Sequence, residues 1–195
     1  MPGETLGWTE NGVQRRMPLE VGVTYLENID LYHEIILNRV LNAATSVWIA
    51  TANAKDLQAE VNGQYESLIE KLARRSAHGL EVRFLHAGKP SSYFMESLYR
   101  QRAFPGTTLE LRQCPRLHYK AIVVDGAGVY LGSANWTGAG LGAKMEERRN
   151  FEIGTWSEDP RLVREVASFF DLIWTGEFCP ECGRRDICPQ PLDLL

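Results

Sequence analysis

The chain of 195 residues is 44% hydrophobic and 24% charged, and its formal net charge is −4. This length suits a single domain with a substantial core. No apolar run reaches the roughly 18 residues that a transmembrane helix needs, so a membrane-spanning protein is not expected. The first residues do not resemble a secretory signal, and a cytoplasmic location is the default expectation.

Predicted strands and helices alternate along most of the chain. Residues 1–18 show no clear period, so we expect an irregular N-terminal arm there. Asp30 is expected to cap the first helix. Hydrophobic patterns predict strands at 21–26, 46–52, 80–86 and 107–112, and helices at 30–44, 65–77 and 91–103.

A last helix is predicted after residue 158. It begins at Asp159–Pro160, because an acidic cap followed by proline favours a helix start, and it ends at Gly176. Its apolar stripe is expected to be Leu162, Val166, Phe169, Phe170 and Ile173. The alternation of strands and helices along the whole chain predicts an α/β domain with helices layered on a sheet.

The stretch from His118 to Asn135 reads H-x-K-x4-D-x6-G-S-x-N. An Asp-Gly pair separates two strand-like runs within it, which is a strong hairpin signal. Because side chains alternate along a strand, His118 and Lys120 share a face, and Ser133 and Asn135 do so if the extended backbone continues. The hairpin would bring an imidazole, a cation, a hydroxyl and an amide to one rim, where they could hold and attack a phosphodiester.

This spacing resembles the HKD motif of the phospholipase D superfamily, with every position of the motif present. Asn150–Gly154 also resembles the downstream strand of that family, with Glu152 as its acidic residue. The resemblance covers about residues 20–175. It implies a mixed β-sheet flanked by helices, the layered sandwich of phospholipase D-like proteins, and a catalytic domain over residues 19–176.

The resemblance also implies a mechanism. Two HKD motifs form one active site in this superfamily, and this sequence has one motif, so a homodimer is implied. One His118 would form a phosphohistidine, while the other would protonate the leaving oxygen and then activate water. Lys120, Ser133 and Asn135 would stabilise the phosphoryl charge, and Glu152 would orient a His118 ring. No cofactor is implied for catalysis.

Asp125 is open to two interpretations. It occupies the third position of the HKD motif and therefore belongs to the candidate catalytic set. Since it precedes Gly126 in a predicted turn, it could instead only cap the hairpin.

Positive charge is concentrated before and within the motif. Residues 71–120 hold 10 basic and 3 acidic side chains, a net charge of +7, whereas residues 1–70 and 121–195 carry −6 and −5. A positive surface beside the motif would attract a polyanion. The alternative is that these basic side chains form a solvated helix face. The candidate phosphate contacts are Arg112, Arg116, Arg148 and Arg149.

Three functions remain open at this point. The first is a metal-independent nuclease acting on DNA or RNA, because the single-motif bacterial proteins that this sequence resembles are endonucleases. The second is lipid chemistry, either phospholipase D activity or phosphatidyl transfer. The third is a non-catalytic nucleic-acid-binding module with the same fold, against which the intact motif argues.

The C-terminal tail, residues 177–195, is rich in cysteine. Cys179 and Cys182 form a C-x2-C-G knuckle, Cys188 follows, and Cys114 lies just before the motif. Four thiolates suit a structural Zn2+ ion. An iron–sulfur cluster and unrelated free thiols are the alternatives.

Overall fold

The computed structural model describes residues 7–10, 13–16, 18–61, 63–102 and 108–192. These residues form a seven-stranded sheet with the strand order β3-β11-β10-β9-β4-β7-β8. β4, β7 and β8 are parallel to one another, while the pairs on the other side are antiparallel. The strands are β3 (Thr24–Glu27), β4 (Ser46–Thr51), β7 (Glu81–His86), β8 (Leu109–Gln113), β9 (Lys120–Val124), β10 (Gly128–Gly132) and β11 (Ile153–Ser157). The predicted mixed sheet is confirmed.

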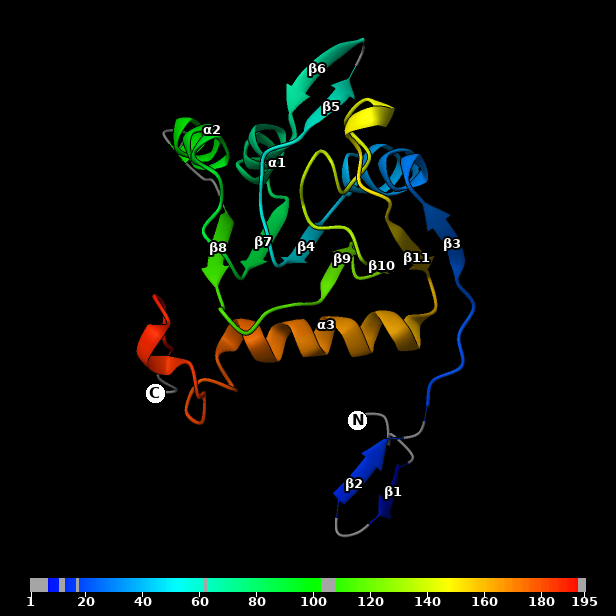
Figure 1. The fold of residues 1–195 in the computed structure, drawn as a ribbon, viewed down its shortest axis with the longest axis vertical. Coiled ribbons are helices and arrows are strands. Elements are labelled where there is room, and N and C mark those ends of the chain that lie inside the picture. The colour runs from blue at the N-terminus through cyan, green and yellow to red at the C-terminus, as the bar shows by residue number, and fades with distance from the viewer. Residues whose placement is uncertain (1–6, 11–12, 17, 62, 103–107, 193–195) are drawn as a thin grey trace.

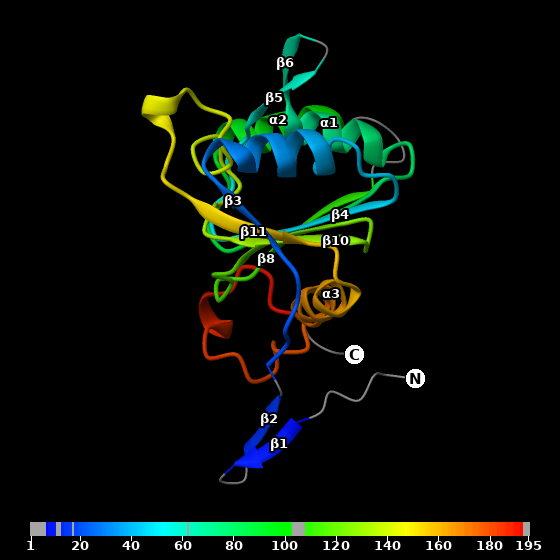
Figure 2. The ribbon, with the colours of Figure 1, turned by 90° about the vertical axis from the view of Figure 1, so that its right-hand side faces the viewer.

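Helices cover both faces of this sheet. The π-helix η1 (Leu31–Val40), α1 (Leu68–Ser76) and α2 (Ser92–Arg102) lie on one face, and α3 (Pro160–Thr175) lies on the other (Figures 1 and 2). The main core lies between the sheet and the first group, where Ile35, Ile36, Val82 and Phe84 are fully buried. Within the described residues, no helix is both long and apolar enough to cross a membrane.

Two short hairpins were not expected. β1 (Gly7–Glu10) pairs with β2 (Val13–Arg16), so the prediction of an irregular arm was wrong for these residues. β5 (Gln58–Val61) pairs with β6 (Gln64–Ser67), and α1 therefore begins three residues later than predicted. Strands of four residues are too short to show a clear period.

Two helix details also differ from the prediction. Asp30 does not cap η1 with its side chain, because its carboxylate accepts a hydrogen bond from the Glu27 backbone instead, at 3.4 Å. On α3 the buried side chains are Val163, Phe170 and Trp174. Of the predicted stripe, Leu162, Val166 and Ile173 are partly buried against the sheet, whereas Phe169 is 47% exposed. The predicted start and end of α3 are right, since the Asp159 carboxylate accepts from the Arg161 backbone and Gly176 has a left-handed conformation.

Candidate active site

Three strand ends meet at one edge of the sheet. Gly132 of β10 lies opposite Lys120 of β9 on one side and opposite Gly154 of β11 on the other. The residues next to these positions in sequence therefore gather at this edge. They are His118 and Lys120 before and at the start of β9, Ser133 and Asn135 after β10, and Glu152 before β11.

Glu152 is the buried acidic group of this edge, with only 8% of its surface exposed. Its carboxylate accepts hydrogen bonds from the Ser133 hydroxyl and, at 3.1 Å, from the side-chain amide of Asn150. Its backbone N–H donates to the side chain of Asn28 at 3.2 Å. These contacts fix both the carboxylate and the Ser133 hydroxyl before any substrate is present.

Asn135 is held by residues from β4 and the loop after it. Its side-chain oxygen accepts from the Thr51 hydroxyl at 3.3 Å and from the Asn53 backbone N–H at 3.1 Å. Thr51 is itself buried and also accepts from the Trp136 backbone at 2.9 Å. With its oxygen held in this way, Asn135 has its two amide N–H groups available as donors.

His118 and Lys120 supply the imidazole and the ammonium group of this edge. The His118 side chain is exposed, and within the described residues its ring makes no hydrogen bond. The Lys120 ammonium donates to the His118 carbonyl at 2.9 Å, so the lysine side chain folds back along its own strand. An exposed imidazole beside a fixed cation is suited to meeting a phosphate from solvent.

The glycines of this edge make room for an aromatic ring. A Cβ atom at Gly132 would lie 2.2 Å from the Tyr130 hydroxyl oxygen, and one at Gly154 would lie 2.3 Å from the Tyr130 ring. Tyr130 is completely buried, and burial followed by the nearby Glu152 charge raises the pKa of its phenol. The glycine in the G-S-x-N part of the motif, Gly132, is therefore needed to leave room for the Tyr130 side chain.

A family model described as the PLD-like domain of cardiolipin synthase matches residues 36–174. The chain belongs to the PLD-like domain family. A search of curated proteins found no match.

Solved structures share this PLD-like fold. NucT from Helicobacter pylori is similar with a TM-score of 0.54 and 14% identity, over 78% of this chain and 94% of NucT. Nuc from Salmonella typhimurium, a phospholipase D family member, gives a TM-score of 0.52 and 15% identity over 78% and 95% of the two chains. A polyphosphate kinase from Porphyromonas gingivalis matches with a TM-score of 0.50 and 15% identity, over 76% of this chain but 22% of the kinase.

Asp125 lies at the opposite end of β9 from His118 in this PLD-like domain. Its carboxylate accepts hydrogen bonds from the backbone N–H groups of Ala44, Thr45 and Ser46 at 2.7–3.0 Å, and from the Thr45 hydroxyl at 3.0 Å. The geometry corresponds to the second interpretation, a turn residue that ties the hairpin to the start of β4. We therefore leave Asp125 out of the catalytic group.

This position leads to a prediction about stability and pH. Burial alone would raise the pKa of Asp125, but the donors of residues 44–46 outweigh it, and the pKa is lowered. A carboxylate whose pKa is lower in the native protein than in the unfolded chain stabilises the fold at pH values above the pKa of the unfolded chain. This stabilisation is lost as the pH falls through the pKa of the native protein. Asp125→Asn should lower the free energy of unfolding at pH 7 by about 1–2 kcal/mol, discounted for the partial exposure of the group.

The measurement is denaturant unfolding of both proteins between pH 3 and pH 7. The difference between them should shrink below about pH 4, because the carboxylate of the unfolded wild-type chain becomes protonated there while the native carboxylate, whose pKa is lowered, keeps its charge to lower pH. A difference that stayed constant down to pH 3 would contradict this account of Asp125.

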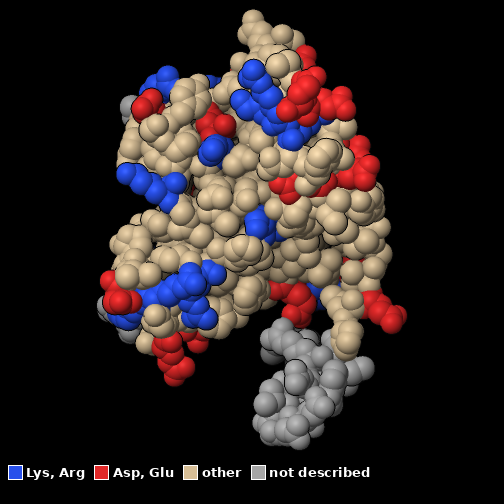
Figure 3. All heavy atoms as spheres, in the orientation of Figure 1, with Lys and Arg blue, Asp and Glu red and all other residues tan. Residues whose placement is uncertain are grey.

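On one face of the molecule the basic side chains do not form a continuous band. On the face shown in Figure 3, Lys and Arg side chains gather in separate groups with uncharged surface between them. Lys71 and Arg74 pair with Glu66, and Arg75 donates to the Leu41 and Ala43 carbonyls, close to the start of β4. These residues lie at the end of the sheet away from His118, so they are not the positive surface that was expected beside the motif.

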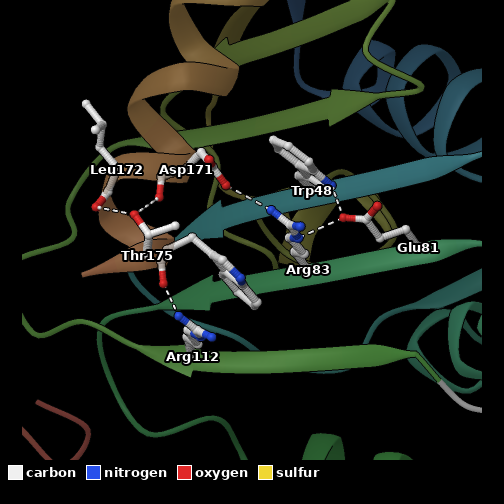
Figure 4. Close-up of polar contacts among 8 residues, drawn as sticks. Trp48, Glu81, Arg83, Arg112, Asp171, Leu172 and Thr175 are labelled. Carbon is white, nitrogen blue, oxygen red and sulfur yellow. Dashed lines mark hydrogen bonds and ion pairs between the residues drawn. The ribbon is translucent and has the colours of Figure 1, made fainter. Parts of the chain in front are cut away.

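Arg112 has a structural partner on α3. Figure 4 shows its guanidinium at the end of that helix, where it donates to the Trp174 carbonyl and lies 4.6 Å from the Trp174 ring centroid. Arg83 of β7 makes a similar anchor, since it pairs with Asp171 at 2.9 Å and Glu81 at 2.7 Å. The proposed phosphate contact at Arg112 is thus already engaged in holding α3 to the sheet.

The remaining candidate arginines differ in their surroundings. Arg148 is exposed on the segment between β10 and β11, and Arg149 donates from Nε to the Lys144 carbonyl at 2.5 Å. Arg116 is exposed, and its positive charge lies near the Cys182 thiol in the cavity that both residues line. Arg148 is therefore the candidate for which the structure records no competing partner within its described residues.

The four cysteines line a single cavity of about 470 Å3 that also borders His118. All four are partly buried and carry free thiols. Within the described residues, no three His, Cys, Asp or Glu side chains stand close enough together to form a finished metal site.

Some of the groups that organise the site were not anticipated. Asn28, Thr51, Asn53 and Asn150 orient Glu152 and Asn135, yet none of them belongs to the HKD pattern. A usable signal was present for two of them: Thr51 and Asn53 are polar residues at the carboxyl end of a buried strand. Ligand sites of α/β proteins are commonly found at such ends.

Proposed function

We propose that this protein is a metal-independent phosphodiesterase that cleaves nucleic acid in an active site shared by two copies of the chain. The observation that supports this most is the gathering of His118, Lys120, Ser133, Asn135 and Glu152 at one sheet edge of a PLD-like domain. This set contains a nucleophile, a cation, hydrogen-bond donors and an acid, but only one imidazole.

The proposed reaction has two displacements at phosphorus. In the first, the His118 ring nitrogen of one protomer forms a P–N bond while the bond from phosphorus to the leaving oxygen breaks. The imidazolium of the second protomer gives its proton to that oxygen. In the second, this imidazole, now neutral, takes a proton from water, whose oxygen attacks phosphorus and releases the first histidine.

The neighbouring groups have distinct roles in this scheme. The Lys120 ammonium offsets the negative charge on the non-bridging phosphoryl oxygens, and the Asn135 amide donates to one of them. Ser133 is bonded to Glu152 in the free protein, so its hydroxyl can exchange that acceptor for a phosphoryl oxygen. Glu152 is then available to accept from a His118 ring and fix its tautomer.

The surface beside the site supports a shared arrangement. Phe151, adjacent to Glu152 in sequence, is 98% exposed, and the neighbouring side chains Ile153 and Tyr25 are 56% and 60% exposed. Aromatic residues are enriched at the centres of protein interfaces. A dimer whose two-fold axis passes close to this apolar surface would bury it and would bring the second His118 close to the first.

Nucleic acid is the substrate class that we favour over lipid. Arg148 is an exposed cation on the segment that leads from the site to β11, where it could contact a neighbouring phosphate of a polymer. Lipid chemistry is the second candidate, because the matching family model is described by a cardiolipin synthase domain. Both substrates contain a phosphodiester, so the same residues would act on either.

Chelation tests the chemistry. Purified protein is incubated with plasmid DNA, RNA or phosphatidylcholine vesicles, each with and without EDTA. Cleavage of DNA or RNA should continue at an unchanged rate in EDTA, because a side chain is the nucleophile and Lys120 meets the phosphoryl charge. Activity that is lost in EDTA and restored by Mg2+ would refute the proposal, and turnover of the vesicles alone would favour lipid chemistry.

A salt series on the nucleic-acid reaction adds a second measurement. Binding to a polyanion weakens steeply with salt because condensed counterions are released. An apparent affinity that did not change between low and moderate salt would argue against a nucleic-acid substrate.

A further inference from the structure

The C-terminal tail, residues 177–192, folds without an apolar core of its own. None of these residues is buried, and its largest apolar side chains, Phe178 and Ile187, are 44% and 67% exposed. Five of its side chains are partly buried, and three of those five are cysteines: Cys179, Cys182, Arg185, Cys188 and Leu192. A segment of this size without a core usually needs a disulfide or a metal ion to hold its shape.

Hydrogen bonds hold this tail against Cys114, which is far away in sequence. Arg184 donates to the Pro115 carbonyl at 2.6 Å, and the Gln190 side-chain oxygen accepts from the Gln113 backbone at 2.7 Å. These two contacts involve the residues immediately before and after Cys114. The tail therefore brings Cys179, Cys182 and Cys188 to the cavity that Cys114 also lines.

Positively charged side chains lie beside this junction. Arg116 lines the same cavity as the four cysteines, and Arg184, which holds the tail to Pro115, follows Cys182 by two residues. Cations near several thiolates offset the negative charge that these ligands place on one metal centre.

We propose that Cys114, Cys179, Cys182 and Cys188 bind one structural Zn2+ ion. They line the same cavity, and four thiolates with a C-x2-C pair are a common structural zinc set. Because no three of these groups already stand at metal-binding separation within the described residues, the sulfurs must close in on the ion by rotation of the partly buried cysteine side chains and a small movement of the tail. Each thiol loses its proton as it binds.

The ion would connect the tail to the segment that carries His118. Cys114 lies four residues before His118, and both border the same cavity. A closed four-thiolate site has no open position for substrate or water, so the zinc is structural and the proposed phosphodiesterase chemistry does not pass through it.

Elemental analysis of the full-length protein, purified without chelators, tests this proposal. About one zinc per chain is expected, and both Cys114→Ser and Cys182→Ser should lose nearly all of it. Both variants should also unfold at a lower temperature than wild type. Asp186→Asn is the matched control, because it changes an exposed side chain of the same tail and should keep the zinc.

A second measurement avoids reliance on variants that fold poorly. Wild-type protein made with Co2+ should show the strong thiolate-to-metal absorption and the visible bands of a tetrahedral site. Iron with inorganic sulfide would overturn zinc in favour of a cluster, and metal-free protein with four free thiols or with disulfides would overturn the metal site. Retention of zinc in Cys114→Ser would refute the four-cysteine set.

Discussion

His118→Ala should abolish phosphodiester cleavage. In a symmetric dimer this single change removes the nucleophile from one protomer and the general acid from the other, so both displacements lose an essential group. We expect turnover to fall by at least about 10^3-fold, as is typical when a nucleophile is removed. The measurement is the initial rate of substrate cleavage in EDTA, with equal amounts of variant and wild-type protein.

A matched histidine control is available in the same chain. His78 is exposed at the end of α1, where its ring lies 2.9 Å from the Arg74 carbonyl, at the end of the sheet away from His118. His78→Ala should therefore cleave at the wild-type rate. Because His118 is also exposed, its variant should unfold at the wild-type temperature. A His118→Ala protein that folds normally and still turns over substrate would contradict the phosphohistidine mechanism.

Mixing subunits should reveal a site that neither chain can complete alone. A heterodimer of wild-type and His118→Ala chains keeps only one imidazole at the two-fold axis, so it should be almost inactive. The two chains carry different affinity tags and are co-purified through both, and the heterodimer is assayed before the subunits exchange. The expected rate is far below half that of the wild-type dimer.

The controls for this experiment distinguish assembly from chemistry. A doubly tagged wild-type dimer and a heterodimer of wild-type with His78→Ala should both be fully active. If the His118→Ala heterodimer retained half of the wild-type rate, each protomer would hold a complete site. The shared-site mechanism would then be wrong, although the PLD-like fold would stand.

The fold was largely predictable because its long elements have clear patterns. The alternation around Val82 and Phe84 identified β7 as a strand, and the Asp159–Pro160 pair identified the start of α3. The short β5–β6 hairpin was missed because its strands offer too few positions for a period. The buried face of α3 was misjudged by one residue, since Phe169 and Phe170 are equally apolar in sequence and only packing distinguishes them.

The sequence pattern alone could predict only those site residues that lie close to one another along the chain. His118, Lys120, Ser133 and Asn135 lie on one hairpin, so their spacing alone places them together. Most residues that orient Asn135 and Glu152 are distant in sequence: Asn53 is 82 positions from Asn135, and Asn28 is 124 positions from Glu152. Such pairs depend on the strand order of the sheet, which no local pattern in the sequence specifies.

The bonds made by Asp125 have a consequence for how β9 can vary. The backbone of Asp125 donates to the Ser46 carbonyl at 2.9 Å, and its carboxylate holds residues 44–46, so the pairing of β9 with β4 is locked at its far end. A slip of one residue would turn every side chain of β9 to the opposite face. Insertions in the connection before His118 would therefore lengthen that loop while leaving the Lys120 side chain on the same face of the sheet. An insertion of one residue between Lys120 and Asp125 would move the Lys120 side chain to the opposite face of the sheet. The end of the hairpin at Asp125 would stay in place.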